Sequence, residues 1–86
     1  MITFRVKSNT DAKKLGGAIF TNIKNCDNIT LSCLGAGALN QAIKSLIIAR
    51  GIATPVGINL YFIPAFDVAE VDSQEKTLIK ILIKKM

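Results

Sequence analysis

Histidine is absent from this sequence of 86 residues, and cysteine occurs only twice, at Cys26 and Cys33. The two cysteines do not form a CxxC pair, so a zinc site would lack its usual spacing and its commonest nitrogen ligand. Catalysis has equally little support, because no cysteine stands beside a base and no carboxylate pair falls on a well-placed buried element. We therefore expect free thiols, no metal, no cofactor and no enzymatic activity.

Long apolar runs are also missing, although half of the residues are hydrophobic. The longest runs, residues 46–49 and 60–66, fall far short of the roughly 18 to 20 residues that a membrane span needs. The first residues pass directly into a strand pattern and do not resemble a signal peptide. We expect a cytoplasmic protein without a membrane partner.

Acidic residues are few, with 6 Asp and Glu against 11 Lys and Arg and a net charge of +5. This balance favours polyanions through long-range attraction, but it is equally common in proteins that bind none. Four of the acids fall within residues 66–75, at Asp67, Glu70, Asp72 and Glu75. Their spacing matches no calcium motif, so we expect a solvated connecting segment there.

The short length limits how much apolar surface the chain can bury by itself. We expect a single domain, residues 1–86, and a domain of this size buries only about 60 to 65% of its unfolded surface. Self-association would bury more, which makes a homodimer plausible.

The chain opens with a strand pattern followed by a helix start. Ile2, Phe4 and Val6 alternate with polar residues, which predicts a strand with one buried and one basic face. Residues 8–11 offer several N-cap oxygens, and Ser8 with Asp11 has the spacing of a capping box. A helix is therefore predicted to begin there.

The predicted first helix, residues 11–25, is amphipathic but has two unusual features. Gly16 and Gly17 each cost it about 1 kcal/mol relative to Ala, so they mark either a close-packing point or a soft place. Lys13 and Lys14 stand in the first turn, where the helix dipole disfavours cations. A phosphate bound at this helix start would reverse that balance, and two solvated lysines are the equal alternative.

The clearest structural signal is a strand over residues 29–34, a turn of small residues and a helix closed by Gly51. The helical pattern places five apolar residues on the core side: Leu39, Ala42, Ile43, Leu46 and Ile47. Ile48 falls on the opposite side among polar residues, and suggests a surface for a partner, most economically a second copy of the chain.

The last third of the chain predicts two strands joined by the acidic segment. Residues 58–64 are nearly all apolar, which predicts a largely buried strand with Pro64 at its end or at an edge bulge. The final strand, residues 76–84, leaves Leu78 and Leu82 as apolar surface for a partner. The order β-α-β-α-β-β predicts an α+β two-layer sandwich, with two helices on one face of a four-stranded mixed sheet.

Both helices should begin at one edge of this sheet, because the carboxyl ends of parallel strands meet there. Backbone amides and ammonium groups at such an edge suit phosphate oxygens. The candidate nucleic-acid-binding residues are Lys7, Ser8, Asn9, Lys13, Lys14, Gly35, Gly37, Asn40 and Lys44. The Gly-Ala-Gly turn alone is a weak signal, since it lacks the rest of a dinucleotide or P-loop motif and also suits a sharp turn with close helix packing.

A longer stretch carries a family resemblance. Gly-Ala-Gly-Ala-Leu-Asn-Gln-Ala-Ile-Lys at residues 35–44, followed by Ile-Ala-Arg-Gly, resembles the hallmark of the stage V sporulation protein S family. The likeness continues through residues 17–18, 63–66 and 75–77. That family resembles the chromatin protein Alba in fold, which implies an Alba-like fold and, by analogy only, binding of DNA or RNA. Alba-type proteins embrace DNA with a basic hairpin, whereas this chain has acids in the corresponding segment.

Two functions follow as hypotheses. The first is a small nucleic-acid-binding regulatory protein, acting as a dimer in the control of sporulation or a related developmental programme. The second is a protein–protein interaction module that uses Ile48 and the final strand and does not bind nucleic acid directly. The aromatic residues, Tyr61 and Phe66 among them, are expected mostly at core-facing positions and not as a stacking platform for bases.

Overall fold

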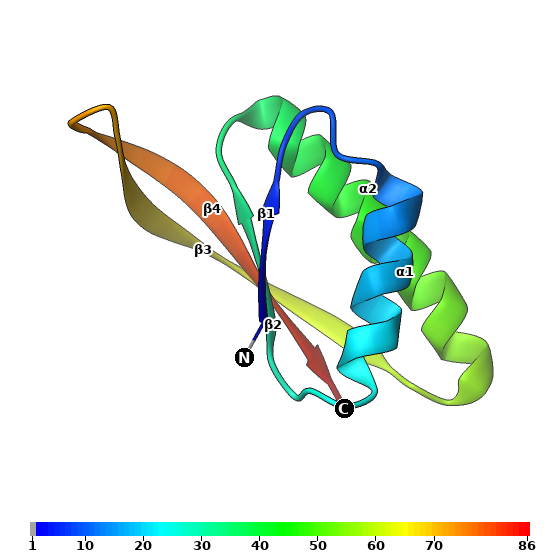
Figure 1. Cartoon of the computed structure of the whole chain (residues 1–86). Coiled ribbons are helices and arrows are strands. Elements are labelled where there is room, and N and C mark those ends of the chain that lie inside the picture. The colour runs from blue at the N-terminus through cyan, green and yellow to red at the C-terminus, as the bar shows by residue number, and fades with distance from the viewer. Residues whose placement is uncertain (1) are drawn as a thin grey trace.

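The computed structural model describes residues 2–86. Its elements are, in chain order, β1 (Ile2–Val6), α1 (Ala12–Ile23), β2 (Ile29–Cys33), α2 (Ala36–Ala53), the 3₁₀ turn η1 (Thr54–Val56), β3 (Leu60–Val71) and β4 (Gln74–Lys85). The four strands form one mixed sheet in the order β1-β2-β4-β3, and both helices lie on the same face of it (Figure 1). The predicted α+β architecture is confirmed. Within residues 2–86, no helix has the length and apolar character to cross a membrane.

The core lies between the helices and one face of the sheet, and the strand register builds it. Phe4 on β1 lies opposite Leu31 on the parallel strand β2, and Leu31 lies opposite Ile81 on the antiparallel strand β4. Alternate residues of each strand therefore line up in rows that face the helices. Ile19 and Ile23 of α1 pack against these rows and are fully buried.

The two helices pack closely at Gly16. A Cβ atom at Gly16 would lie 2.7 Å from Cγ2 of Ile48 and 3.0 Å from the carbonyl oxygen of Ser45. A Cβ at Gly17 would meet no atom within 4 Å among residues 2–86 beyond its chain neighbours and the backbone of its own helix turn. Gly16 is thus the close-packing point of the pair and Gly17 is not. Ile48 is half-buried against α1, so its predicted place on an exposed face is wrong.

The core-facing side of α2 consists mostly of small residues. Its buried members are Ala38, Ala42, Ser45, Leu46, Ala49 and Ala53. Ile43 and Ile47, which the sequence assigns to the core, are 44% and 66% exposed. The small side chains bring the α2 backbone close to α1 and to the sheet, and that space is too narrow for two more isoleucines. They lie instead along the flank of α2 away from α1.

Helix α2 does not end at Gly51 as predicted. It continues to Ala53 and passes into η1, and the left-handed residue that ends it is Gly57, with φ of 81°. The N–H of Ile58 then donates to the carbonyl of Ala53 at 3.1 Å. Glycine is tolerated inside a helix, so Gly51 alone could not identify the end.

Strands β3 and β4 form a long hairpin in place of the predicted short strand and acidic loop. Their register runs without a bulge from Leu60 opposite Lys85 to Val71 opposite Gln74, and passes straight through Pro64. β3 is an edge strand, where a residue without an N–H is tolerated. The predicted burial of residues 58–64 is also wrong, since most of β3 is exposed.

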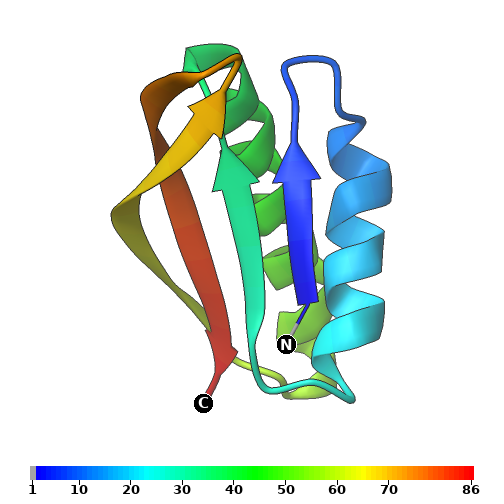
Figure 2. The same ribbon diagram turned by 60° about the vertical axis from the view of Figure 1, so that its left-hand side comes forward.

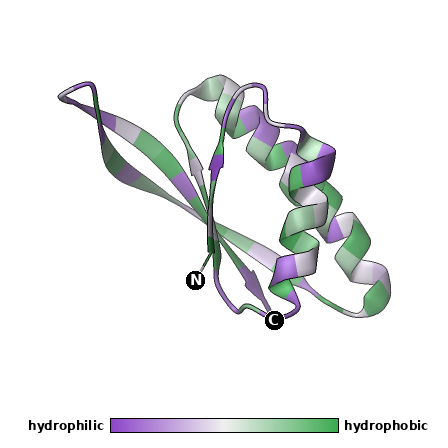
Figure 3. Cartoon of the chain, viewed as in Figure 1, coloured by the Kyte–Doolittle hydropathy of each residue, from purple (hydrophilic) through white to green (hydrophobic). Residues whose placement is uncertain are grey.

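The outer part of the hairpin extends past the helix layer and makes the molecule 44 Å long (Figure 1). Hydrophobic and hydrophilic residues alternate along it (Figure 3). Most of the segment that the sequence predicts as an acidic connection is part of the hairpin strands. Asp67 and Glu70 lie in β3, and the turn consists of Asp72 and Ser73.

Candidate nucleic-acid interface

The first turns of the two helices meet at one end of the sheet. A Cβ atom at Gly37 would lie 2.8 Å from Cβ of Ser8, so the start of α2 touches the loop before α1. The Gln41 side chain donates from Nε2 to the carbonyl oxygen of Thr10 at 2.7 Å and ties the same two segments together. Both helix starts also share one end of the molecule in Figure 2. We call residues 7–14 and 35–40 the helix-start rim.

The α1 side of the rim already holds a carboxylate. Asp11 is the N-cap, and its Oδ1 accepts from the backbone N–H groups of Lys13 at 3.0 Å and Lys14 at 3.1 Å. Asp11 also offsets the misfit of two lysines in a first turn. In this structure the Asp11 carboxylate therefore occupies the two amides that a bound phosphate would use, and Asp11, not Ser8, is the N-cap, so the predicted capping box with Ser8 is wrong. Lys13 and Lys14 offer only their exposed side-chain charges.

The α2 side of the rim leaves its amide donors free. Gly35 is the N-cap, and no side chain in the described part of the chain caps this helix start. Gly35 has φ of 93°, a conformation that glycine adopts without strain. The first amides of α2 are therefore available to an anion, and its helix dipole favours one.

The rim gathers most of the predicted nucleic-acid-binding residues. Exposed members are Lys7, Ser8, Asn9, Lys13, Lys14, Gly35, Gly37 and Asn40. Lys44 lies apart from them, about 12 Å along α2 from its first residue, as follows from the rise of 1.5 Å per residue.

A groove of about 670 Å³ runs from the rim toward the hairpin. Lys7, Ser8 and Gly37 line its rim side, while Asp67 and Glu70 line its hairpin side. Asp67 is held in place because its Oδ1 accepts from the N–H of Val68 at 2.8 Å. A phosphate entering the groove meets cations on one wall and carboxylates on the other. Residues 2–86 contain no cluster of His, Cys, Asp and Glu able to hold a metal ion.

Sequence reasoning missed Arg5 as a member of this groove. The alternation of β1 could have indicated this residue. Arg5 stands between two apolar residues whose side chains face the helices, so its own side chain points to the opposite face of the sheet. What the sequence did not show is that the groove continues onto that face of the sheet.

The three residues predicted to contact a second copy offer little apolar surface. Leu78 is only 8% exposed, and Leu82 and Ile48 are half-buried. Large apolar side chains that are well exposed include Phe66 at 80%, Ile47 at 66% and Val68 at 59%.

These exposed side chains belong to one continuous surface. Leu39, Phe66 and Ile79 line a shallow hollow beside the start of α2, and Ile43 and Ile47 follow Leu39 at helical spacing on α2. We call Leu39, Ile43, Ile47, Phe66 and Val68 the outer apolar strip.

Both cysteines are free thiols, as the sequence predicts. Cys33 is buried in the core, and desolvation raises the pKa of its thiol above the ordinary value of 9.0. Cys26 is half-buried, and its Sγ donates to the carbonyl oxygen of Asn28 at 3.1 Å. Neither thiol lies in the rim.

Comparison with known proteins agrees with this fold. Over residues 2–86 the sequence matches the family described as Stage V sporulation protein S (SpoVS). Among solved structures, the chain is similar to Alba from Thermoplasma volcanium, with a TM-score of 0.64, 14% sequence identity and 96% of each chain covered. At this identity the likeness shows the fold alone, and it confirms the expected Alba-like architecture.

Proposed function

We propose that this chain, which belongs to the stage V sporulation protein S family, is a nucleic-acid-binding regulatory protein that acts as a homodimer in sporulation or a related developmental programme. The observation that carries the proposal is the contact between Ser8 and Gly37. It puts the uncapped amides of α2 next to the lysines of the β1–α1 loop and of the first turn of α1. Donors and cations on one surface suit the phosphates of a polyanion.

The electrostatics of the rim predict moderate affinity. Lys7, Lys13 and Lys14 attract phosphate, whereas Asp11 and the carboxylates of the groove repel it. The hairpin therefore does not grip a phosphate backbone as a basic hairpin would. Binding should depend steeply on salt, because each cation that neutralises a phosphate releases counterions.

A titration of a labelled DNA duplex and its RNA counterpart at two salt concentrations tests this proposal. Lys13→Glu with Lys14→Glu should weaken binding at low salt about tenfold or more and flatten the salt dependence. The matched control is Lys24→Glu with Arg50→Glu, which makes the same change in net charge at the far ends of α1 and α2. Absence of binding at low salt, or equal loss in both double variants, would contradict a site at the rim.

The homodimer is proposed to form through the outer apolar strip. A contiguous exposed apolar surface of this kind typically marks a protein contact, and small chains gain stability by burying more surface. The strip meets the rim at Leu39 but includes none of the residues 7–14, so a second copy covering the strip would leave the lysines of that segment open to a polyanion.

The alternative, a protein interaction module, is supported by the same strip. In that case the strip would bind a different protein, and the acidic residues of the hairpin would contact a basic surface of that partner. Co-purification with a protein partner that nuclease treatment does not reduce, together with a monomeric state for the pure chain, would favour this alternative.

A further inference from the structure

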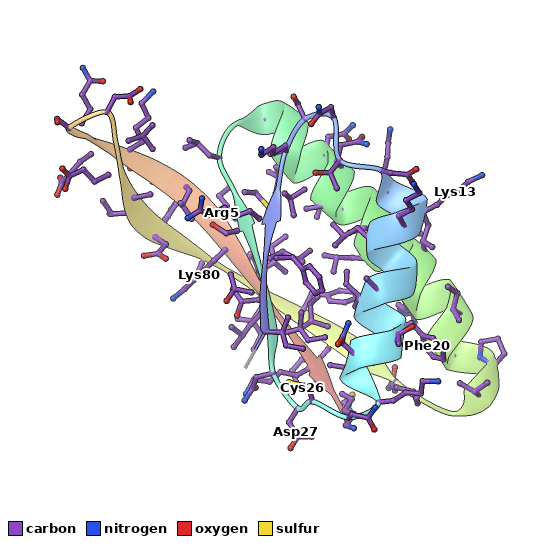
Figure 4. All side chains as sticks on the ribbon, in the orientation of Figure 1. Arg5, Lys13, Phe20, Cys26, Asp27 and Lys80 are labelled. Atoms are coloured by element: carbon purple, nitrogen blue, oxygen red, sulfur yellow. The ribbon has the colours of Figure 1, made fainter. Side chains whose placement is uncertain are left out.

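The sheet face opposite the helices carries a row of residues across all four strands. The register places Arg5 opposite Ser32, Ser32 opposite Lys80, and Lys80 opposite Ala65. Figure 4 shows Arg5 and Lys80 on the side of the sheet away from the helices. One small residue, Ser32, thus separates the two cations, and Ala65 ends a row about 14 Å long, given strand spacings of about 4.8 Å. We call this the open face.

The open face has an excess of positive charge. Lys76 and Lys84 share it with Lys80, because alternate residues of β4 point to the same side. Among the paired positions of this face, Asp67 is the one carboxylate. The one ion pair within residues 2–86 joins Lys85 and Asp27, so the cations of the open face remain unneutralised.

Aromatic and aliphatic side chains lie between these cations. Tyr61 is 40% exposed and stands opposite Lys84, while Ile63 is 44% exposed and stands opposite Leu82. The expectation that the aromatic residues mostly face the core is therefore wrong for Tyr61, and also for Phe66 on the other face. A flat surface that combines ammonium groups with an exposed ring suits phosphates and bases together.

The charge pattern distinguishes between possible occupants of this face. A second copy meeting it face to face would bring its own lysines against Lys80 and Lys84, and like charges repel at such short range. A duplex keeps its bases stacked inside and presents mainly phosphates to a sheet, so Tyr61 would have no base to contact. A single strand offers both unpaired bases and phosphates.

We propose that the open face binds single-stranded nucleic acid, with phosphates near Arg5, Lys80 and Lys84 and a base stacked on Tyr61. This deepens the proposed function by naming a ligand class, but it uses a different surface from the rim. The groove joins the two surfaces, because it is lined by Arg5 and Ser32 as well as by Ser8 and Gly37. One strand can therefore follow both.

The composition of the chain supplies a direct reporter, because Tyr61 is its single tyrosine and it has no tryptophan. Titration with a 12-residue oligothymidylate should quench the fluorescence of Tyr61 by stacking, whereas a 12-base-pair duplex at equal phosphate concentration should quench it much less. Heparin, a polyanion without bases, should bind without quenching. Equal quenching by all three, or no binding of oligothymidylate at low salt, would overturn the inference.

Substitutions distinguish the contribution of the lysine charges to binding from the contribution of base stacking on Tyr61. Lys80→Glu with Lys84→Glu should weaken binding of labelled oligothymidylate about tenfold or more. Tyr61→Ala should weaken it about tenfold, near the lower end of the effect for one stacked base, whereas Tyr61→Phe should bind like the wild type. Each variant is checked for its fold by far-ultraviolet circular dichroism, and Lys84→Gln, at the end of β4, serves where the double variant does not fold.

The binding site at the rim and the binding site at the open face can be tested independently. If Lys13→Glu with Lys14→Glu abolishes duplex binding but leaves the quenching of Tyr61 by oligothymidylate intact, both sites stand. If the rim variant changes nothing while Tyr61→Ala and the open-face variants weaken single-strand binding, the rim is wrong and this inference holds. If Tyr61→Ala and Tyr61→Phe bind equally tightly, the stacking role is wrong.

Discussion

At the scale of single residues, the adjacent glycines of α1 have opposite roles. Gly16→Ala should destabilise the fold by about 1 to 3 kcal/mol, because its methyl group would press on the side chain of Ile48 and on the backbone carbonyl of Ser45. Gly17→Ala should stabilise it by about 0.5 to 1 kcal/mol through helix propensity alone. Urea unfolding of both variants measures this, and each serves as the other's control. Effects of equal sign would contradict the packing at Gly16.

The two thiols should react at very different rates. A thiol reagent at pH 8 should modify Cys26 promptly and Cys33 only when the chain unfolds, because Cys33 is buried and the pKa of its thiol is raised by desolvation. Counting the thiols that react with and without urea checks this. Two fast thiols in the native protein would contradict it.

The same burial affects stability at high pH. The unfolded chain ionises Cys33 near the ordinary pKa of 9.0, before the folded chain does, so this group lowers stability as pH rises above about 9. The stability difference between wild type and Cys33→Ala should therefore shrink between pH 8 and pH 10. Comparing the two proteins at each pH cancels every pH effect that they share.

The sequence could indicate some of these roles and not others. It identified Gly16 and Gly17 as a packing point or a soft place, but deciding between them required the position of Ile48. It placed Asp11 and Lys13 correctly at a helix start. It could not show that the Asp11 carboxylate occupies the amides that a phosphate would need, because that depends on one side-chain rotamer.

At the scale of elements, hydrophobic periodicity identified both helices and three of the four strands near their true bounds. It failed on the orientation of α2, where apolar residues cover more than one side of the helix. Ala42 and Ile43 look equally suited to the core, and only the close approach to α1 at Gly16 decides that Ala42 is buried while Ile43 is exposed. It also failed on β3, because a strand with Pro64 in its middle looks interrupted.

The hairpin turn contains strain that a substitution can relieve. Asp72 and Ser73 both have positive φ, 52° and 63°, in a two-residue turn. Ser73→Gly should stabilise the turn by about 1 kcal/mol, because glycine adopts this conformation without a Cβ clash. Slower amide hydrogen exchange at the ends of β3 and β4 would report it. Ser73→Ala is the control, and an equal effect of both substitutions would rule out relief of backbone strain.

At the scale of the whole molecule, connectivity explains why the rim was predictable and the other surfaces were not. Any β-α-β-α order with β1 and β2 parallel brings the two helix starts to one end. The open face and the outer apolar strip instead depend on how β3 pairs with β4 beyond the helices. Ile63 and Phe66 fall on opposite faces only because the register continues through Pro64. A shift of one residue would exchange them.

The proposed homodimer can be tested on these surfaces. If the chain dimerises through the outer apolar strip, Phe66→Ser with Val68→Thr should make it monomeric, because both side chains are more than half exposed there. Analytical ultracentrifugation over a range of concentrations measures the change. The wild-type melting temperature should rise with protein concentration, whereas that of the variant should not, since only a dimer links folding to concentration.

Ile63→Ser provides the matched control for the dimer. It removes a 44% exposed apolar side chain from the same strand, but from the open face. A dimer built on the strip, related by a two-fold axis, should survive this substitution, because each copy would use the helix side of its own hairpin. Dissociation by Ile63→Ser but not by the strip variant would move the interface to the open face, where it would compete directly with single-stranded nucleic acid. Dimerisation and binding would then exclude each other, whereas contact through the strip allows both at once.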